Sequence, residues 1–309
     1  MARYIRIQKG IGRLKSSNIE EELKRAKTSV RRWWWEYLRL SKDYWLICQT
    51  TSSRMNPRTT DELMINLYRQ FGDIYKINFD TWYVETGSRI FMEQVALPEV
   101  DEIKDDLSNL MDLRDGRLLL DIPLSMTQRS INKQINRILK KHQNERPKNV
   151  LEVSKSKFPI NPIKFRLLTL QRTHEVLCLH IELIDKPIAL GLAEDKYSTK
   201  ADLFKIGKAL KLSPSNEILT EEADVRHQRI NRMRATVGRY LTKGKLLLGN
   251  VERGEFPSYK TIKTKRELFT KRQKESHAEL EALWWDLDLS SELSSVKIAD
   301  ARRIAYSWY

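Results

Sequence analysis

Apolar residues recur at alternating steps of three and four along much of this chain, and that spacing restricts the fold to one built mainly of helices. The clearest case begins at Asn161-Pro162, a capping residue followed by proline at the first helical position. One continuous seam then runs over three heptads, formed by Ile163, Leu167, Leu170, His174, Leu177, Ile181 and Ile184. Pro187 is expected to end this helix, and the seam is expected to face the core.

Large aromatic residues concentrate near both ends of the chain. In the first half, helical spacing relates Val30, Trp33, Trp34, Tyr37 and Leu38. Because Trp33, Trp34 and Trp35 are consecutive, they cannot all face one core, and at least one should be partly exposed or meet another segment. At the other end stand Trp284, Trp285, Trp308 and Tyr309. We favour docking of these last aromatics onto the N-terminal helices, while exposed aromatics would offer a site for a protein partner.

A small β element is expected near residues 118–153. Residues 118–122 are the best strand candidate, between Asp115-Gly116 and Pro123, and residues 150–153 are a second one. We therefore divide the chain into an aromatic-rich helical domain, 1–115, and a basic helical domain with the small β element, 116–309.

Composition limits the class of protein. At 309 residues and 40% hydrophobic side chains, the chain has enough apolar material for a buried core. Its two cysteines, Cys48 and Cys178, are too few for a disulfide framework or a four-cysteine zinc site. No apolar run approaches the length of a membrane span, and the charged residues after the basic N-terminus argue against a signal peptide. These features predict a cytoplasmic protein that does not bind membranes.

Charge is segregated along the chain. The 56 Lys/Arg and 41 Asp/Glu give a net charge of +15, which favours a polyanionic partner. Residues 93–121 carry −6 and residues 275–300 carry −6, whereas residues 126–149 carry +6 and residues 226–274 carry +12. Helical spacing is expected again from Thr127 to His142, with an isoleucine stripe and most of the basic residues outside it.

Residues 198–250 combine a short helix, a break and a long basic helix. In outline this resembles a helix-turn-helix domain, and IGKALKLSPS (206–215) is similar to the first helix and turn of such domains. The resemblance covers about 50 residues and implies DNA binding through the second helix. The break at 212–220 is longer than the usual turn of three or four residues, which is a departure from that pattern.

The expected second helix has two offset stripes. The apolar side consists of Ile230, Met233, Val237, either Tyr240 or Leu241, and Leu248. The basic stripe consists of Arg229, Arg232, Thr236, Arg239 and Lys243. Arginines three and four residues apart lie along one line and can bridge phosphate oxygens. A second basic track is expected at Lys263, Lys265, Arg266, Lys271 and Arg272. The alternative to nucleic-acid binding is that the basic stripe is only a solvent-exposed helix face, whose charges pair with an acidic segment at 93–121 or 275–300.

Catalytic patterns fit this chain poorly. It lacks GxxxxGK[ST], GxGxxG and GxSxG, so we expect no nucleotide cofactor and no nucleophile elbow. A metal-nuclease site at Asp121, Glu152 and Lys155 is the nearest catalytic alternative, and His174 with Cys178 is better explained as core than as a metal site. The sequence thus predicts a non-catalytic nucleic-acid-binding protein without cofactor or metal, with DNA expected ahead of RNA. A protein-interaction adaptor is the second hypothesis, and a metal-dependent nuclease subunit is the third.

Overall fold

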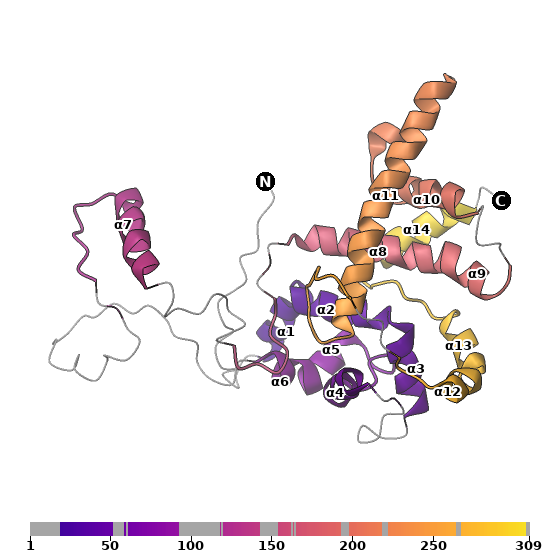
Figure 1. The fold of residues 1–309 in the computed structure, drawn as a ribbon, viewed down its shortest axis with the longest axis horizontal. Coiled ribbons are helices and arrows are strands. Elements are labelled where there is room, and N and C mark those ends of the chain that lie inside the picture. Colours follow the sequence, from indigo (N-terminus) through magenta and orange to yellow (C-terminus); the bar gives the residue numbers. More distant parts are fainter. Residues whose placement is uncertain are drawn as a thin grey trace.

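The computed structural model describes residues 19–51, 59, 61–92, 118, 120–142, 154–161, 163, 165–192, 198–217, 222–263 and 267–306. These residues form a mainly helical structure (Figure 1), which confirms the predicted fold class at that level. In chain order its elements are α1 (Ile19–Lys27), α2 (Val30–Arg39), α3 (Lys42–Thr50), α4 (Glu62–Phe71), α5 (Phe79–Trp82), the π-helical turn η1 (Tyr83–Gly87), α6 (Ser88–Phe91), α7 (Gln128–Lys141), α8 (Leu167–His180), the π-helical turn η4 (Ile181–Asp185), α9 (Lys186–Ala189), α10 (Ser198–Ala209), the 3-10 turn η5 (Pro214–Asn216), α11 (Ala223–Val251), α12 (Lys271–Ser276), α13 (Ala278–Trp284) and α14 (Ser295–Tyr306).

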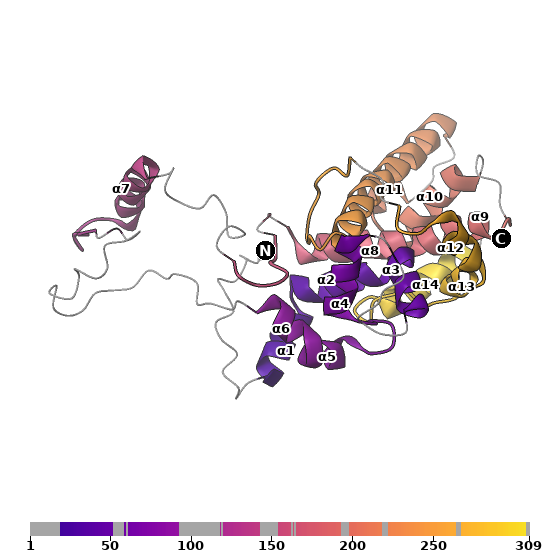
Figure 2. The same cartoon turned by 60° about the horizontal axis from the view of Figure 1, so that its bottom comes forward.

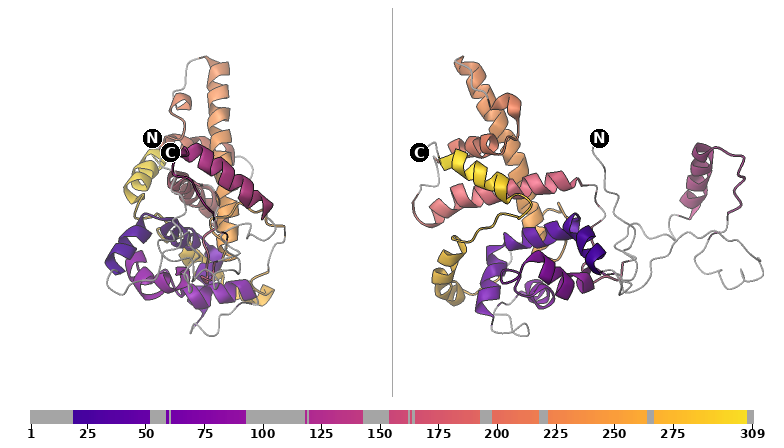
Figure 3. Two further views of the ribbon diagram at one scale, coloured as in Figure 1. Left: turned by 90° about the vertical axis from the view of Figure 1, so that its left-hand side faces the viewer. Right: turned by 180° about the vertical axis from the view of Figure 1, so that it is seen from behind.

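The helices form two groups stacked on each other. Helices α1 to α6 make up one group, and α8 with its continuation through η4 into α9 lies across it (Figures 1 and 2). Helices α10 and α14 lie on the far side of α8, and α11 runs from that side down to α2 (Figure 3). The pair α12 and α13 lies beside α3 at the edge of the first group.

Helix α2 is the centre of the core and is buried on every side. Trp33 packs on His174 of α8 with 5.6 Å between ring centroids, and Trp34 packs on Phe256 at 5.7 Å. Trp35 meets the rings of α5. All three indoles are therefore buried, each against a different segment, so these aromatics are not exposed for a partner.

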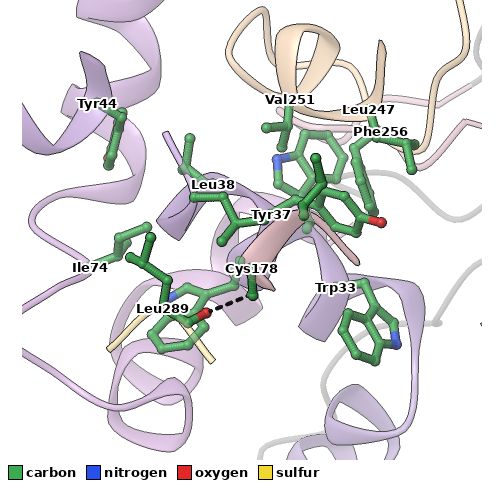
Figure 4. Packing of buried hydrophobic residues seen from close by; sticks show 14 of the residues in the cluster. Trp33, Tyr37, Leu38, Tyr44, Ile74, Cys178, Leu247, Val251, Phe256 and Leu289 are labelled. Carbon is green, nitrogen blue, oxygen red and sulfur yellow. Dashed lines mark hydrogen bonds between the residues drawn. The ribbon is translucent and has the colours of Figure 1, made fainter. Parts of the chain in front are cut away.

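The same cluster extends from α2 to the C-terminal end of α11. Tyr37 lies against Phe256, with Leu247 and Val251 of α11 close by (Figure 4). The Tyr37 hydroxyl donates a hydrogen bond of 2.9 Å to the carbonyl of Leu170 in α8. The core thus ties together helices that are more than a hundred residues apart in the sequence.

Two ion pairs are buried along α2. Arg31 contacts Glu22 at 2.7 Å and also donates to the hydroxyl of Tyr83. Arg32 contacts Glu36 at 2.5 Å, and burial of the Glu36 carboxyl raises its pKa despite the neighbouring arginines. Each pair is stable only because both charges are present, since either one alone would be a buried, uncompensated charge.

The small β element predicted near 118–153 is not found among the residues of that stretch that the structure describes. The described residues of that stretch, apart from α7, are irregular, and residues 150–153 lie outside the described part of the chain. In the described ranges the sole β contact is an isolated parallel bridge between Ile160 and Phe256. A short apolar run with turn residues on both sides predicts a strand from local signals alone, but a strand needs a neighbour to pair with.

That bridge also explains why α8 begins later than predicted. The backbone N–H of Asn161 donates to the carbonyl of Phe256, and this bond with the bridge at Ile160 ties residues 160–161 to another segment in place of a helical turn. The helix therefore starts at Leu167 and not at Pro162. It also continues past Pro187, because that residue lies in the first turn of α9, directly after the π-helical turn η4.

The boundary predicted at 115/116 lies outside the described residues and stays a prediction. Helices from both sides of it share one hydrophobic cluster. The predicted docking of the C-terminal aromatics is confirmed for Trp284 and Trp285: α13 packs on α3, and the ammonium group of Lys42 lies 5.6 Å from the Trp285 ring centroid. Trp308 and Tyr309 lie outside the described residues.

Candidate nucleic-acid interface

Helix α11 is the longest element described and has 29 residues, which corresponds to about 44 Å. One side is buried through Met233, Val237, Leu241, Leu247 and Val251, against α10, α8 and α2. None of the residues 223–232 is buried, and this end stands beyond the other helices (Figures 1 and 3). The predicted apolar side of this helix is thus confirmed, and its N-terminal turns are open to solvent.

Two glycines set how closely α11 approaches its neighbours. A Cβ atom on Gly244 would lie 2.8 Å from side-chain atoms of Leu177 in α8, and one on Gly207 of α10 would lie 2.5 Å from Met233. Because real Cβ atoms do not make such contacts, only glycine permits this packing distance. The long helix is therefore fixed against α8 and α10 over its C-terminal two thirds.

The basic stripe lies on one flank of this fixed helix. Arg232, Arg239 and Lys243 are exposed, and spacings of seven and four residues put them on one line, about 10.5 Å and about 6 Å apart along the axis. Arg229 is half-buried and has interactions of its own. The Thr236 hydroxyl donates to the carbonyl of Arg232 at 2.9 Å, so its proton is used within the helix.

Several cations elsewhere on the protein are paired with carboxylates. Arg25 pairs with Glu21, Lys27 with Asp80, Lys76 with Asp73, Lys186 with Asp286, Lys260 with Glu255 and Arg303 with Asp300. By contrast, Arg232, Arg239 and Lys243 form no ion pair with any carboxylate in the described ranges. The cause is visible in the sequence, because residues 225–251 contain seven Lys/Arg and no Asp or Glu.

The acidic segment 275–300 does not neutralise this stripe. Five of its seven carboxylates pair elsewhere: Glu281 with Lys42, Asp286 with Lys186, Asp288 with Arg302, Glu292 with Arg32 and Asp300 with Arg303. The other acidic segment, 93–121, falls almost entirely outside the described residues. Within the part of the chain that is described, the basic flank of α11 therefore faces solvent.

The second basic track is not continuous with the first. Lys263 is exposed at the end of the 258–263 segment, where Ile262 packs on Gly249 near the C-terminal end of α11. Lys271 and Arg272 are exposed on α12, which lies beside α13 and away from the free end of α11 (Figures 1 and 3). Lys265 and Arg266 lie outside the described residues.

Sequence reasoning left out two exposed cations of α11. Arg226 lies in the free first turns, and Lys245 lies on the opposite flank from the stripe. The signal that could have found them is the absence of acidic residues from residues 225–251, which makes every exposed cation in that stretch a candidate contact.

His174 and Cys178 lie in the core, as predicted. The Cys178 sulfur is 3.4 Å from Nδ1 of His174, and both side chains are buried. Burial lowers the pKa of His174 to about 3 and raises that of the Cys178 thiol well above its usual value. A neutral imidazole beside a neutral thiol is neither a nucleophile with its base nor an ion pair.

Sites for metal chemistry find no support among the described residues. No group of three or more His, Cys, Asp or Glu side chains within those ranges could hold a metal ion. Asp121 is exposed in an irregular segment, Lys155 is exposed, and Glu152 lies outside the described residues. Tyr240 of α11, one of the two alternatives for the apolar side of that helix, is partly buried and packs against the core cluster.

The helix-turn-helix resemblance holds only in outline. Helix α10 packs along α11, but it ends at Ala209 and α11 begins at Ala223. The connection is thus far longer than the three or four residues of that motif. No known family model, curated protein or solved structure matches the chain. Among the described helices, none is sufficiently long and apolar to cross a membrane.

Proposed function

We propose that this protein binds nucleic acid without catalysis, through the phosphate backbone, using the basic flank of α11. The observation that carries the proposal is the stripe of Arg232, Arg239 and Lys243, which is exposed and unpaired with any described carboxylate on a helix fixed by the core. Unpaired guanidinium groups present several donors that match phosphate oxygens, and no internal ion pair must be broken before binding.

The geometry of the stripe suits a polyanion. From Arg232 to Lys243 the helix rises about 16 Å, and B-DNA presents about five phosphates per strand over that length. Three phosphate contacts would give a slope of log affinity against log salt of about −2.7 on duplex DNA. The stripe contains no feature that reads base edges, so the proposal concerns backbone contact, with DNA as the expected ligand.

The test is a fluorescence anisotropy titration of the full chain with duplex DNA, single-stranded DNA and duplex RNA at low and moderate salt. Arg232→Glu combined with Arg239→Glu should weaken binding at least about tenfold at low salt, and the difference should shrink as salt rises. The matched control is Lys24→Glu combined with Arg303→Glu, which changes the net charge equally at exposed sites on α1 and α14.

Each outcome decides between hypotheses. Wild-type protein that binds none of the three probes at low salt would refute nucleic-acid binding. Equal affinities for the stripe variant and the control, with circular dichroism showing both folded, would show that α11 is not the contact. In that case the adaptor hypothesis, with an acidic protein on this flank, would replace the proposed function.

A further inference from the structure

A second basic helix of the chain is built differently from α11. Helix α7 begins after Thr127, whose side chain caps it by accepting from the N–H of Ser130, and none of its residues is buried. It lies apart from the other described helices in Figures 1 and 2 and in the right-hand view of Figure 3. Every other helix of ten or more residues has buried side chains. Its surface is therefore not explained by packing within the described part of the protein.

The two faces of α7 carry different chemistry. Ile131, Ile135 and Ile138 lie on one stripe and are half-buried, since residues four and three apart share a helix face. The basic residues Arg129, Lys133, Arg137, Lys140 and Lys141 are all exposed. At about 100° per residue, Arg129, Lys133 and Lys140 lie nearly opposite the isoleucine stripe.

The basic face of α7 is unpaired. Residues 122–144 contain five Lys/Arg and no Asp or Glu, so no ion pair can form within the helix. None of the five cations forms an ion pair with a carboxylate of the described residues, which is the condition already found on α11. An acid-free helix face is unusual for a merely solvated helix, which carries both signs of charge.

The basic face of α7 lies opposite the isoleucine stripe, so the two faces would contact different kinds of ligand. A protein groove or a lipid surface would take the isoleucine stripe and leave the opposite, basic face in water. A ligand that contacts the basic face meets several cations and no carboxylate, which fits the phosphodiester backbone of a nucleic acid. Arg129 and Lys140 are eleven residues apart, a rise of about 16 Å, and this matches the length of the α11 stripe.

We propose that α7 is a second phosphate-binding helix, and that it engages the same nucleic-acid molecule as α11. This inference rests on the proposed function. Covalent geometry permits it, because only residues 143–153 separate His142 from Ser154, and twelve residue steps span at most about 42 Å. Contact at one helix then raises the effective concentration of phosphate at the other.

The test removes the α7 charges without disturbing the helix. The α7 variant carries Arg129→Gln, Lys133→Gln, Arg137→Gln and Lys140→Gln, and glutamine is a good helix former. The control variant carries Lys24→Gln, Arg25→Gln, Lys76→Gln and Arg303→Gln, which are exposed on other elements. Both variants lower the net charge from +15 by four. The probes are duplex DNA and duplex RNA of about 8 and about 40 base pairs, the shorter ones being too short for two 16 Å tracks laid end to end.

The α7 variant should bind the long duplex about tenfold or more weakly than the control, and its salt slope should be smaller in magnitude by up to about 3.6. On the short duplex the two variants should differ by less than about threefold. Equal binding of both variants to the long duplex would refute the inference. An equal loss on both lengths would refute simultaneous engagement by α7 and α11. If wild type binds neither length, the proposed function itself fails, and that result is distinct from both.

Discussion

Protonation of His174 should make the stability of this protein depend on pH below neutrality. The ring is buried between Trp33 and Tyr37 in the core, and its Nε2 donates to the carbonyl of Glu36 at 3.3 Å. Burial, reinforced by the positive charges of Arg32 and Arg39, holds its pKa at about 3. In the unfolded chain the same ring titrates near pH 6.5.

The sign follows from proton counts. Below about pH 6.5 the unfolded chain binds a proton at His174 and the folded chain does not, so the free energy of unfolding falls as pH falls. At about pH 5 the folded ring is still neutral, and the loss is set by the unfolded pKa alone, at about 2 kcal/mol. This magnitude is insensitive to the folded pKa as long as that value lies well below 5.

Urea denaturation at about pH 7.5 and about pH 5 measures this difference. His174→Gln removes the titration and should reduce the pH dependence of the free energy of unfolding by about 2 kcal/mol, whatever its effect on stability at pH 7.5. His227→Gln is the control for the substitution itself, because His227 is exposed on α11. An identical pH dependence in wild type and His174→Gln would refute the assignment of a buried, neutral imidazole.

Two further predictions concern packing and buried charge. Gly244→Ala should destabilise the protein by about 1–3 kcal/mol because its methyl group would overlap Leu177; Gly238→Ala, on the same helix with nothing within 4 Å, should stabilise it by about 0.5–1 kcal/mol. A destabilised Gly238→Ala variant in urea titration would contradict this account of α11. Arg31→Met should cost about 3–5 kcal/mol by leaving Glu22 buried and unpaired. Adding Glu22→Gln should recover part of that loss, and a purely additive double-mutant cycle would argue against coupling.

The sequence predicted helices best where local signals and packing agree. For α7, the cap at Thr127 and the isoleucine spacing were sufficient to predict the element, although none of its residues is buried by the described part of the chain. For α11, the Met233 and Val237 spacing gave the buried side correctly. The prediction failed at 161–166, where a single backbone contact with Phe256 competes with helix formation. A local sequence pattern does not reveal a contact with Phe256, which lies about 95 residues away in the sequence.

Burial of the three consecutive tryptophans shows a second limit of the same kind. A helix pattern gives the directions in which Trp33, Trp34 and Trp35 point, but not how many neighbours surround the helix. Here α2 is enclosed by α8, by α5 and by the segment around Phe256, so the side chains of all three tryptophans are buried.

Some features of the candidate interface could be predicted from local sequence, and others depend on tertiary contacts. The stripe of Arg232, Arg239 and Lys243 follows from helical spacing, but whether a carboxylate neutralises it depends on tertiary contacts. The acidic segment 275–300 has enough charge to do so, yet five of its seven carboxylates are held by cations of α2, α3, α9 and α14. None of those pairs involves the stripe, so its positive charge stays on α11, where the core holds one side of the helix and leaves the other to solvent. Arg239 and Lys243 are attached to turns packed against α8 and α10, so their positions are set before any ligand arrives, and binding there need not order the backbone.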